Sequence, residues 1–408
     1  MFEAIGKYNT AKIFTSHLEE TAYGQVLELC NQKAFGGAKV RIMPDSHAGK
    51  GCVIGYTQQL KGRVVPNLIG VDIGCGMEVT YLGKIEIDFA LLDHFIRHKV
   101  PHGHSIHQKV MHKLEKPALQ KQIKRISKKT GTDYEKHQRS IGSLGGGNHF
   151  IEINVDSEGN KILVIHSGSR NLGLQVATYH QKKAERYCTS RLQDLMEQRE
   201  EEIRLLRASG DVDTIPAVIQ KYDAELELYR VPKPLMFLEG AGADEYLEDM
   251  YAAQEFALLN RQGMSKAIAE FLQLDYRNLD KFTTIHNYIN PEDKIIRKGA
   301  ISAKKGEKVI IPINMRDGSI IAIGKGNPDW NYSAPHGAGR LMSRSRAKDL
   351  IHMNDFKDTM RDVWTSSVST KTLDEAPMAY KPIEEILENT KDALEIVEII
   401  KPLYNFKA

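Results

Sequence analysis

Residues 70–77 read GVDIGCGM, a glycine-rich turn that holds an aspartate and a cysteine three positions apart. The turn follows a short apolar run, LIGV (68–71), which is typical of a β-strand. Side chains at positions i and i+3 of a turn can point at one place, and glycines let the backbone approach a metal ion or a phosphate. Carboxylates and thiolates both bind transition metals. A buried cysteine in a tight turn explains this stretch equally well.

The stretches on either side of the turn predict further strands. Residues 36–82 hold several short apolar runs separated by glycines, which indicates strands joined by tight turns. Residues 294–326 alternate apolar runs with the turns KKGE and RDGS, which predicts a β-meander.

Other segments predict helices. Residues 85–139 are mostly helical in pattern, and residues 243–272 predict a helix with Leu247, Met250, Tyr251, Gln254 and Leu258 on one stripe. Residues 174–230 are rich in Glu and Arg and are interrupted by SGD, which predicts an exposed helical hairpin inserted into the core. The last 65 residues also predict helices. With no internal repeat or clear linker, the chain predicts one large α+β domain, 1–408.

Composition narrows the class of protein. The chain has 408 residues, of which 41% are hydrophobic and 27% charged, as in soluble globular proteins. No apolar run approaches the roughly 18 residues of a membrane span. The start, MFEAIGKYNTAKIF, lacks a signal-peptide pattern, and the four cysteines are scattered without a CxxC pair. We therefore expect a cytoplasmic protein with reduced thiols and no membrane partner.

Charge is spread unevenly over the chain. The net charge is only +3, yet the segment from Arg97 to Arg139 contains twelve lysines and arginines and only three acidic residues. Six of the fifteen histidines also lie there. Such a block is either a solvated helix face or a contact with a phosphate backbone, and charge alone slightly favours the first.

Four histidines adjoin strand-like or glycine-rich stretches. They are His149 in GGGNHFIE, His166 in VIHSGSR, His286 in TTIHNY and His336 in APHGAGR. A lone histidine is usually a surface or hydrogen-bonded core residue. Together with the turn at 70–77, however, these four form a candidate ligand set for Mn²⁺, Fe²⁺ or Zn²⁺.

The glycine-rich turns also raise the question of phosphate binding. GSLGGGNH, HSGSR, HGAGR and PDSHAGKG each carry backbone N–H groups that can form an anion-binding nest. None of them matches the Walker A pattern or a dinucleotide-binding fingerprint, so the sequence excludes a P-loop enzyme.

Taken together, these motifs resemble the RtcB family of RNA ligases, which join 3′-phosphate ends to 5′-hydroxyl ends of RNA. The matching stretches run in the family's order over residues 43–381, nearly the whole chain. They are MPDSHAGKG, GVDIGCGM, GGGNHFIE, HSGSR, HNY, RKGAISA, HGAGRLMSR and PMAYK. The resemblance implies a single RtcB-like α+β domain, with mixed β-sheets around a central metal and nucleotide cleft and helices outside.

The resemblance also implies two manganese ions and GTP as cofactors. Asp72, Cys75 and His149 would hold one ion, whereas Cys75, His166 and His286 would hold the other, with the thiolate bridging both. His336 in HGAGR would be the nucleophile that attacks GTP and becomes guanylylated.

The same resemblance implies contacts to guanylate and RNA. The guanylate contacts would be Asn148, Glu152, Ser319, Arg340 and Lys407, with Tyr380 stacked on guanine. The rest of the nucleotide site would comprise His149, Phe150, Ile151, His286, Asn287, Pro312, Met315, Gly337, Ala338 and Gly339. Arg170 and Arg344 would hold the terminal phosphates of RNA, and the basic block then becomes a more credible backbone contact.

Two departures from the family pattern lie near the expected guanine and ribose site. The family often has PGSM where this chain has PINM at 312–315, and Ser or Cys-Ser where this chain has Ala334-Pro335 before His336. Because no ligand or nucleophile is lost, these changes indicate a divergent paralogue subgroup.

Three functions fit these residues. The first is a GTP- and Mn²⁺-dependent ligase that joins RNA 3′-phosphate or 2′,3′-cyclic phosphate ends to 5′-hydroxyl ends in RNA repair or tRNA splicing. The second is a metal-dependent cyclic phosphodiesterase or phosphoesterase that never ligates. The third is a non-catalytic RNA-binding protein on a relict fold. We expect no DNA partner, and the sequence leaves a partner protein open.

Overall fold

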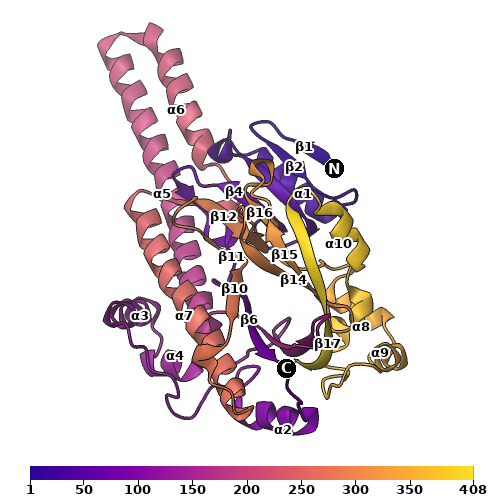
Figure 1. Ribbon diagram of the computed structural model, residues 1–408. Helices are drawn as coiled ribbons and strands as arrows, with labels where there is room; N and C mark the ends of the chain where they lie inside the picture. Colours follow the sequence, from indigo (N-terminus) through magenta and orange to yellow (C-terminus); the bar gives the residue numbers. More distant parts are fainter. Residues whose placement is uncertain (408) are drawn as a thin grey trace.

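The computed structural model describes residues 1–407, and most of its strands form two large sheets (Figure 1). The first has six strands and is antiparallel except where β2 runs parallel to β3. Its strands are, in order, β1 (Phe2–Ile5), β2 (Thr10–Ile13), β3 (Val40–His47), β4 (Ile54–Gln59), β12 (Ile295–Lys298) and β11 (Asn287–Ile289).

The second sheet has seven strands, and every neighbouring pair in it is antiparallel. Its strands are, in order, β10 (Lys281–Ile285), β6 (Gly76–Gly83), β8 (Lys161–Ser167), β7 (Phe150–Val155), β17 (Leu394–Lys407), β15 (Gly318–Gly324) and β14 (Lys308–Asn314). Two small two-stranded sheets complete the set. They pair β13 (Ala300–Ser302) with β16 (Ser333–Pro335) and β5 (Arg63–Val64) with β9 (Leu238–Glu239).

Helices surround the sheets (Figure 1). The α-helices are α1 (Glu20–Cys30), α2 (Phe89–Lys99), α3 (Pro117–Thr130), α4 (Tyr134–Ser140), α5 (Arg170–Ser209), α6 (Ile215–Tyr229), α7 (Ala241–Phe271), α8 (Arg344–Leu350), α9 (Met353–Thr359) and α10 (Ile383–Asn389). The mixture of helices and sheets confirms the α+β class.

The helical hairpin expected between residues 174 and 230 is present as α5 and α6, which project together from the body of the molecule (Figure 1). Helix α5 ends because Gly210 adopts a left-handed conformation, with φ of 82°, and caps the last turn. The basic segment 85–139 contains α2, α3 and α4, with an irregular stretch between α2 and α3.

Helix α7 lies at the centre of the packing. It contacts β6 and β8 of the seven-stranded sheet as well as α3 and α5. Its buried side chains include Tyr246, Met250, Phe256, Asn260 and Arg261, so burial extends well beyond the single stripe that the sequence predicts. No helix within residues 1–407 is both long and apolar enough to span a membrane.

Three predictions of secondary structure were wrong. Residues 68–71 do not form a strand, because the short 3-10 helix Pro66–Leu68 ends there and leads into the turn before β6. Residues 294–326 do not form one meander, because β12, β13 and the β14–β15 hairpin belong to three different sheets. Residues 394–407 are not helical but form the 14-residue strand β17. Its run of Ile, Val, Tyr and Phe favours extended backbone, and both of its neighbours in the sheet offer hydrogen bonds along its length.

Candidate active site

One edge of the seven-stranded sheet gathers the predicted metal ligands. Strand β6 starts directly after Cys75, β7 starts directly after His149, β8 carries His166 near its end, and β10 ends directly before His286. Adjacent antiparallel strands start and end at the same edge, so the register pairs Gly76 with both Ser167 and Ile285. Segments more than 200 residues apart therefore converge on one point.

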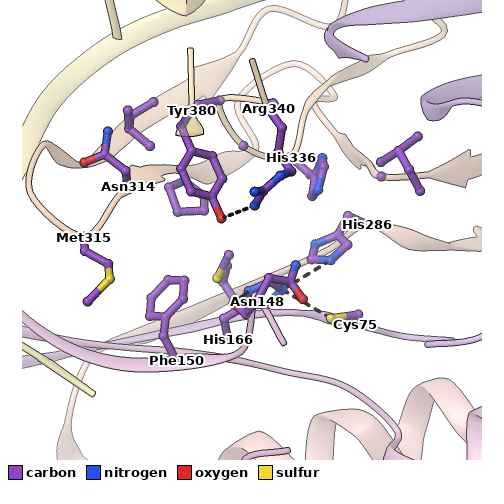
Figure 2. A pocket seen from close by; sticks show the side chains of 18 of the residues that line it. Cys75, Asn148, Phe150, His166, His286, Asn314, Met315, His336, Arg340 and Tyr380 are labelled. Atoms are coloured by element: carbon purple, nitrogen blue, oxygen red, sulfur yellow. Dashed lines mark hydrogen bonds between the residues drawn. The ribbon is translucent and has the colours of Figure 1, made fainter. Parts of the chain in front are cut away.

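A cavity of about 250 Å³ opens over this edge. Figure 2 shows Tyr380, Arg340 and His336 on one side of it, facing Phe150, His166 and Cys75 on the other. The final residues of β17 reach the same place, because Lys407 pairs with Phe150 and lines the cavity.

The cysteine and three histidines meet at hydrogen-bond distances. The Cys75 Sγ atom lies 3.2 Å from His166 Nε2 and 3.4 Å from His149 Nε2. His166 Nε2 in turn lies 3.4 Å from His286 Nε2, and His149 Nε2 lies 2.9 Å from Asp72 Oδ2. The five residues thus form one continuous group, which we call the cavity cluster.

Backbone carbonyls fix the ring orientation of two of these histidines. His149 Nδ1 lies 2.8 Å from the Leu144 carbonyl, and His166 Nδ1 lies 3.1 Å from the Asn148 carbonyl. A carbonyl only accepts, so each Nδ1 carries the proton and each Nε2 presents a lone pair. These lone pairs face the Cys75 sulfur and the Asp72 carboxylate, a concentration of electron-pair donors.

Burial sets the charge of the cavity cluster. It lowers the pKa of His166 and His286 well below the usual value, so both rings are neutral at pH 7. Burial and the neighbouring Asp72 charge raise the pKa of the Cys75 thiol well above its usual range. A divalent cation would reverse this last effect, because a coordinating thiol loses its proton.

The donor set fits a transition-metal ion. Sulfur, imidazole nitrogen and carboxylate oxygen are the ligands such ions take in proteins. Ligand atoms of Cys75, His149 and His166 all lie within 4.8 Å of one another. Gly168 contributes space, since a Cβ there would stand 2.0 Å from Asp72 Oδ1. The arrangement thus leaves facing lone pairs that a cation would satisfy.

His336 follows β16 and is held by a buried aspartate. Its Nδ1 atom lies 2.6 Å from Asp45 Oδ2, and the same oxygen accepts the backbone N–H groups of His336 and Gly337 at 3.1 and 3.3 Å. Asp45 is fully buried. The His336 ring lies 4.7 Å from the His286 ring, measured between centroids. With its proton on Nδ1, His336 presents Nε2 as a free nucleophile.

Glu375 gathers the cationic side chains of the cavity. Its carboxylate accepts hydrogen bonds from the Lys407 ammonium, the Tyr380 hydroxyl and the Arg344 guanidinium, and Arg340 Nη1 lies 3.5 Å away. Although burial opposes ionisation, the Lys407 and Arg344 charges hold the pKa of Glu375 at about 2. Four predicted nucleotide or RNA contacts are therefore held together by one carboxylate.

Glu152 on β7 also faces the cavity, but it has no cation within hydrogen-bond distance. Its two oxygens accept from Asn154 Nδ2 at 2.9 Å and from Asn405 Nδ2 at 2.7 Å. Burial raises the pKa of Glu152 to about 7, against the opposing effects of these amides and of the Lys407 charge.

The cavity gathers most of the predicted site residues. Those that line it are Asp72, Cys75, Asn148, Phe150, Glu152, His166, His286, Asn287, Pro312, Met315, His336, Gly337, Ala338, Gly339, Arg340, Arg344, Tyr380 and Lys407. His149 joins through its contacts with Cys75 and Asp72.

Besides His149, three predicted residues do not line the cavity. Ile151 alternates with Phe150 and Glu152 along β7, so its side chain packs in the hydrophobic core on the other face. Ser319 is fully buried, and its hydroxyl has no hydrogen-bond partner. Arg170 donates to Ser143 Oγ at 3.0 Å and to the Gly103 carbonyl at 2.7 Å, where it ties two loops together beside Asp72.

Two important residues lay outside the sequence prediction. Asp45 belongs to PDSHAGKG, a stretch noted only as a polar glycine-rich loop, and it lies 291 residues from its partner His336. Glu375 stands next to PMAYK, within DEAPMAYK. Acidic residues inside these stretches were the available signal, but their partners are set by the tertiary fold.

The fold and the cavity together define an α+β protein with a candidate site for metal ions and phosphate. The profile of the family described as "tRNA-splicing ligase RtcB" matches residues 29–408. The chain belongs to the RtcB family, which confirms the resemblance drawn from its motifs.

Individual relatives agree. The chain is 30% identical to the RNA-splicing ligase RtcB of Escherichia coli strain K12, over 89% of this chain and 88% of that protein. It is 28% identical to the tRNA-splicing ligase RtcB of Aeropyrum pernix, over 85% of this chain and 83% of that protein. It is 24% identical to RNA-splicing ligase RtcB2 of an Escherichia coli strain, over 85% of this chain and 81% of that protein.

Proposed function

We propose that the protein is a GTP- and Mn²⁺-dependent RNA ligase that joins 3′-phosphate or 2′,3′-cyclic phosphate ends to 5′-hydroxyl ends. Membership of a family whose relatives are named RNA-splicing ligases supports RNA as the substrate. The observation that carries the proposal is the position of His336, oriented by Asp45 and adjacent to His286 in the cavity.

The metal site would use the cavity cluster. Asp72, Cys75 and His149 would hold one ion, whereas Cys75, His166 and His286 would hold the second. When bound, manganese supplies positive charge that neutralises phosphate oxygens. The carbonyls of Leu144 and Asn148 keep the His149 and His166 rings in the tautomer that such binding requires.

His336 would carry the transferred nucleotide. Its Nε2 lone pair attacks the α-phosphorus of GTP, an N–P bond forms, and the bond to the departing pyrophosphate oxygen breaks. Asp45 accepts from Nδ1–H throughout, which stabilises the positive charge that develops on the ring. The cations gathered around Glu375 line the same cavity, where Arg340 and Lys407 would hold guanylate oxygens and Tyr380 would stack on the base.

Sealing would follow in two further transfers. A cyclic phosphate end is first hydrolysed to a 3′-phosphate. An oxygen of that phosphate attacks the phosphorus on His336, the N–P bond breaks, and GMP is joined to the RNA end. The 5′-hydroxyl then attacks the RNA 3′-phosphorus, loses its proton, and GMP leaves as the new phosphodiester forms.

The basic segment would contact the RNA backbone with only part of its charge. Lys116, Arg125 and Lys129 of this segment are already paired with acidic residues of α7. Lys121, Lys124 and Lys128 are exposed and take no part in these pairs. We therefore assign RNA contact to the outer face of α3, together with Arg344 at the cavity.

The proposed cytoplasmic location agrees with the state of the thiols. The four cysteines, Cys30, Cys52, Cys75 and Cys188, are all free and buried. Cys75 must remain a thiol to act as a ligand, which a reducing compartment ensures.

Incubation with α-labelled GTP and Mn²⁺ tests the proposal. Wild-type protein should retain acid-labile GMP, and His336→Ala should retain none. His17→Ala is a matched control, since His17 lies outside the cavity, and it should label as wild type does. Unlabelled wild-type protein, or equal labelling of His336→Ala, would contradict the proposal.

A second assay separates ligation from hydrolysis. RNA that carries a 2′,3′-cyclic phosphate and a separate 5′-hydroxyl strand should be joined only when GTP is present. Release of a 3′-phosphate that is never joined would instead establish the phosphodiesterase alternative.

A further inference from the structure

We propose that Asn260 and Arg261, two adjacent buried residues of α7, are positioning residues that lock the ligand-bearing segments of the cavity cluster together. We call them the α7 clamp. The inference rests on the metal site of the proposed function, and it adds two residues that the motifs do not include. Both side chains are fully buried.

Asn260 uses its whole hydrogen-bonding capacity on two of these segments. Its Oδ1 accepts the backbone N–H groups of Gly142 and Ser143 at 2.8 and 3.0 Å. Its Nδ2 donates to Ser167 Oγ and to the Gly168 carbonyl, each at 3.0 Å. Two donors and two acceptors fix the amide orientation without ambiguity. Asn260 therefore joins the loop that leads to His149 with the end of β8.

Ser167 extends this connection to a ligand. Its hydroxyl donates to the Leu144 carbonyl at 2.8 Å, the same carbonyl that lies 2.8 Å from His149 Nδ1. Asn260 thus acts on His149 through Ser167 and Leu144, without touching the ring. Because the Leu144 carbonyl selects the tautomer of His149, a shift of this carbonyl would rotate the ligand lone pair.

Arg261 joins two more segments to β8. Its Nη1 donates to the carbonyls of Gly74 and Ser167, each at 2.9 Å. Gly74 lies between Asp72 and Cys75, and Ser167 follows His166. Its Nη2 lies 3.5 Å from Thr283 Oγ1 on β10, the strand that ends before His286. The two clamp residues together reach every segment that carries a predicted ligand.

The close packing of the turn on α7 supports the same conclusion. A Cβ added to Gly74 would stand 2.7 Å from the Gln254 backbone, so the turn lies directly on the helix. A guanidinium buried here is costly, because its charge leaves water. Two carbonyls that belong to ligand-bearing segments accept from its Nη1, although its Nε is buried without a hydrogen-bond partner, and an apolar side chain would remove both of these hydrogen bonds.

Titration with Co²⁺ alone tests the clamp independently of ligation. Thiolate-to-cobalt absorption reports the Cys75 bond, and ligand-field bands report geometry. Arg261→Lys keeps the positive charge but loses the branched guanidinium that donates to several groups at once. Asn260→Asp keeps an oxygen that accepts from Gly142 and Ser143 but loses the amide N–H that donates to the Gly168 carbonyl. Each should weaken Co²⁺ binding by about tenfold or more and change the charge-transfer band.

Arg297→Lys is the matched control. Arg297 is also fully buried, but it donates to Asp293, to Ser333 and to the carbonyls of Asn331 and Tyr332, none of which belongs to a ligand-bearing segment. It should lower the melting temperature as Arg261→Lys does while leaving Co²⁺ affinity and spectrum unchanged. Ser167→Ala provides a smaller variant should Arg261→Lys not fold, and it should weaken binding in the same direction.

The outcomes separate the clamp from the site itself. If wild-type protein binds Co²⁺ and the folded clamp variants bind it equally with the same spectrum, the clamp is overturned while the metal site stands. Equal weakening by Arg297→Lys would also overturn it, since the effect would then be general loss of stability. A wild-type protein that binds no Co²⁺ overturns the metal site and the clamp together.

Discussion

Two buried groups in this molecule combine histidine with acidic or thiol side chains. One is the cavity cluster. The other, which we call the helix cluster, comprises His180 on α5 with Glu245 and Asp249 on α7. The ligand-type atoms of the helix cluster lie within 4.8 Å of one another, and so do those of Cys75, His149 and His166 in the cavity cluster. Side-chain types and proximity therefore do not distinguish them.

The difference lies in what neutralises the charge. In the helix cluster, Lys129 Nζ lies 2.6 Å from Glu245 and also bonds Asp249, Lys183 bonds Glu245, and His180 Nε2 lies 2.8 Å from Asp249. Protein cations complete that group. In the cavity cluster, no lysine or arginine within residues 1–407 lies at hydrogen-bond distance from Cys75 or Asp72, and Arg261 and Arg170 act on these two groups only through space. The helix cluster is therefore an ion-pair network completed by lysines, whereas the donors of the cavity cluster have no such direct partner among these residues.

The largest expected effect comes from the cavity cluster. Cys75→Ala removes the donor shared by both proposed ions, so affinity for both Mn²⁺ ions should fall about 100-fold or more. Calorimetric titration of Mn²⁺ measures this. Cys188→Ala removes another buried thiol, which is hydrogen-bonded to the Phe237 backbone and lies outside the cavity, and should bind Mn²⁺ normally. Normal binding by Cys75→Ala would place the cluster in the same class as the helix cluster.

A variant of the helix cluster should act on stability instead. Lys129→Met leaves Asp249 buried without its lysine, which should lower the free energy of unfolding by about 3 kcal/mol. Urea denaturation measures this, with Lys121→Met on the exposed side of α3 as a control that should change stability by less than about 0.5 kcal/mol. Mn²⁺ affinity should stay the same, and a change in it would break the comparison.

Glu152 tests a third arrangement, a buried carboxyl held by amides alone. Its pKa is raised from 4.5 to about 7, so the folded state binds its proton more tightly than the unfolded state. The associated stability is complete below pH 4.5 and is lost as pH rises through 7, in total about 3 kcal/mol. Glu152→Gln should lack this dependence, as unfolding measured at pH 5 and 7.5 would reveal. Parallel pH profiles for the two proteins would exclude the raised pKa.

The smallest expected change is in Mn²⁺ affinity when Asp72 of the cavity cluster is replaced. Asp72→Ala removes a donor to only one proposed ion, so one Mn²⁺ site should weaken by about tenfold. The second site is the internal control and should keep its affinity. Equal weakening of both sites would mean that the two ions do not divide the ligands as proposed.

The sequence predicted individual strands, helices and ligand motifs better than it predicted which distant residues contact one another. Cys75, His149, His166 and His286 were recognisable because each adjoins a strand and the motifs occur in a family's order. Strand β17 was missed because a short amphipathic run such as LEIVEIIK fits either a helix or a strand. Its extended conformation is determined by pairing with β7 and β15 on its two sides.

Partners across long separations were not predictable. Asp45 and His336 are 291 residues apart, and nothing local to either residue indicates their hydrogen bond. Asn260 and Arg261 belong to a helix whose sequence shows an apolar stripe beside them. Polar residues on such a helix normally face solvent, and only the packing of α7 between α5 and the sheet buries them.

The position of β17 has a consequence for the order of assembly. It lies between β7 and β15, so it joins the strands β6, β7 and β8 of residues 76–167, with β10 at their far edge, to the β14–β15 hairpin of residues 308–324. During synthesis on the ribosome, these two groups of strands cannot be hydrogen-bonded through β17 until that strand has left the ribosome. Because pairing over such separations is slow, the nucleotide cavity should be among the last features of the nascent chain to form.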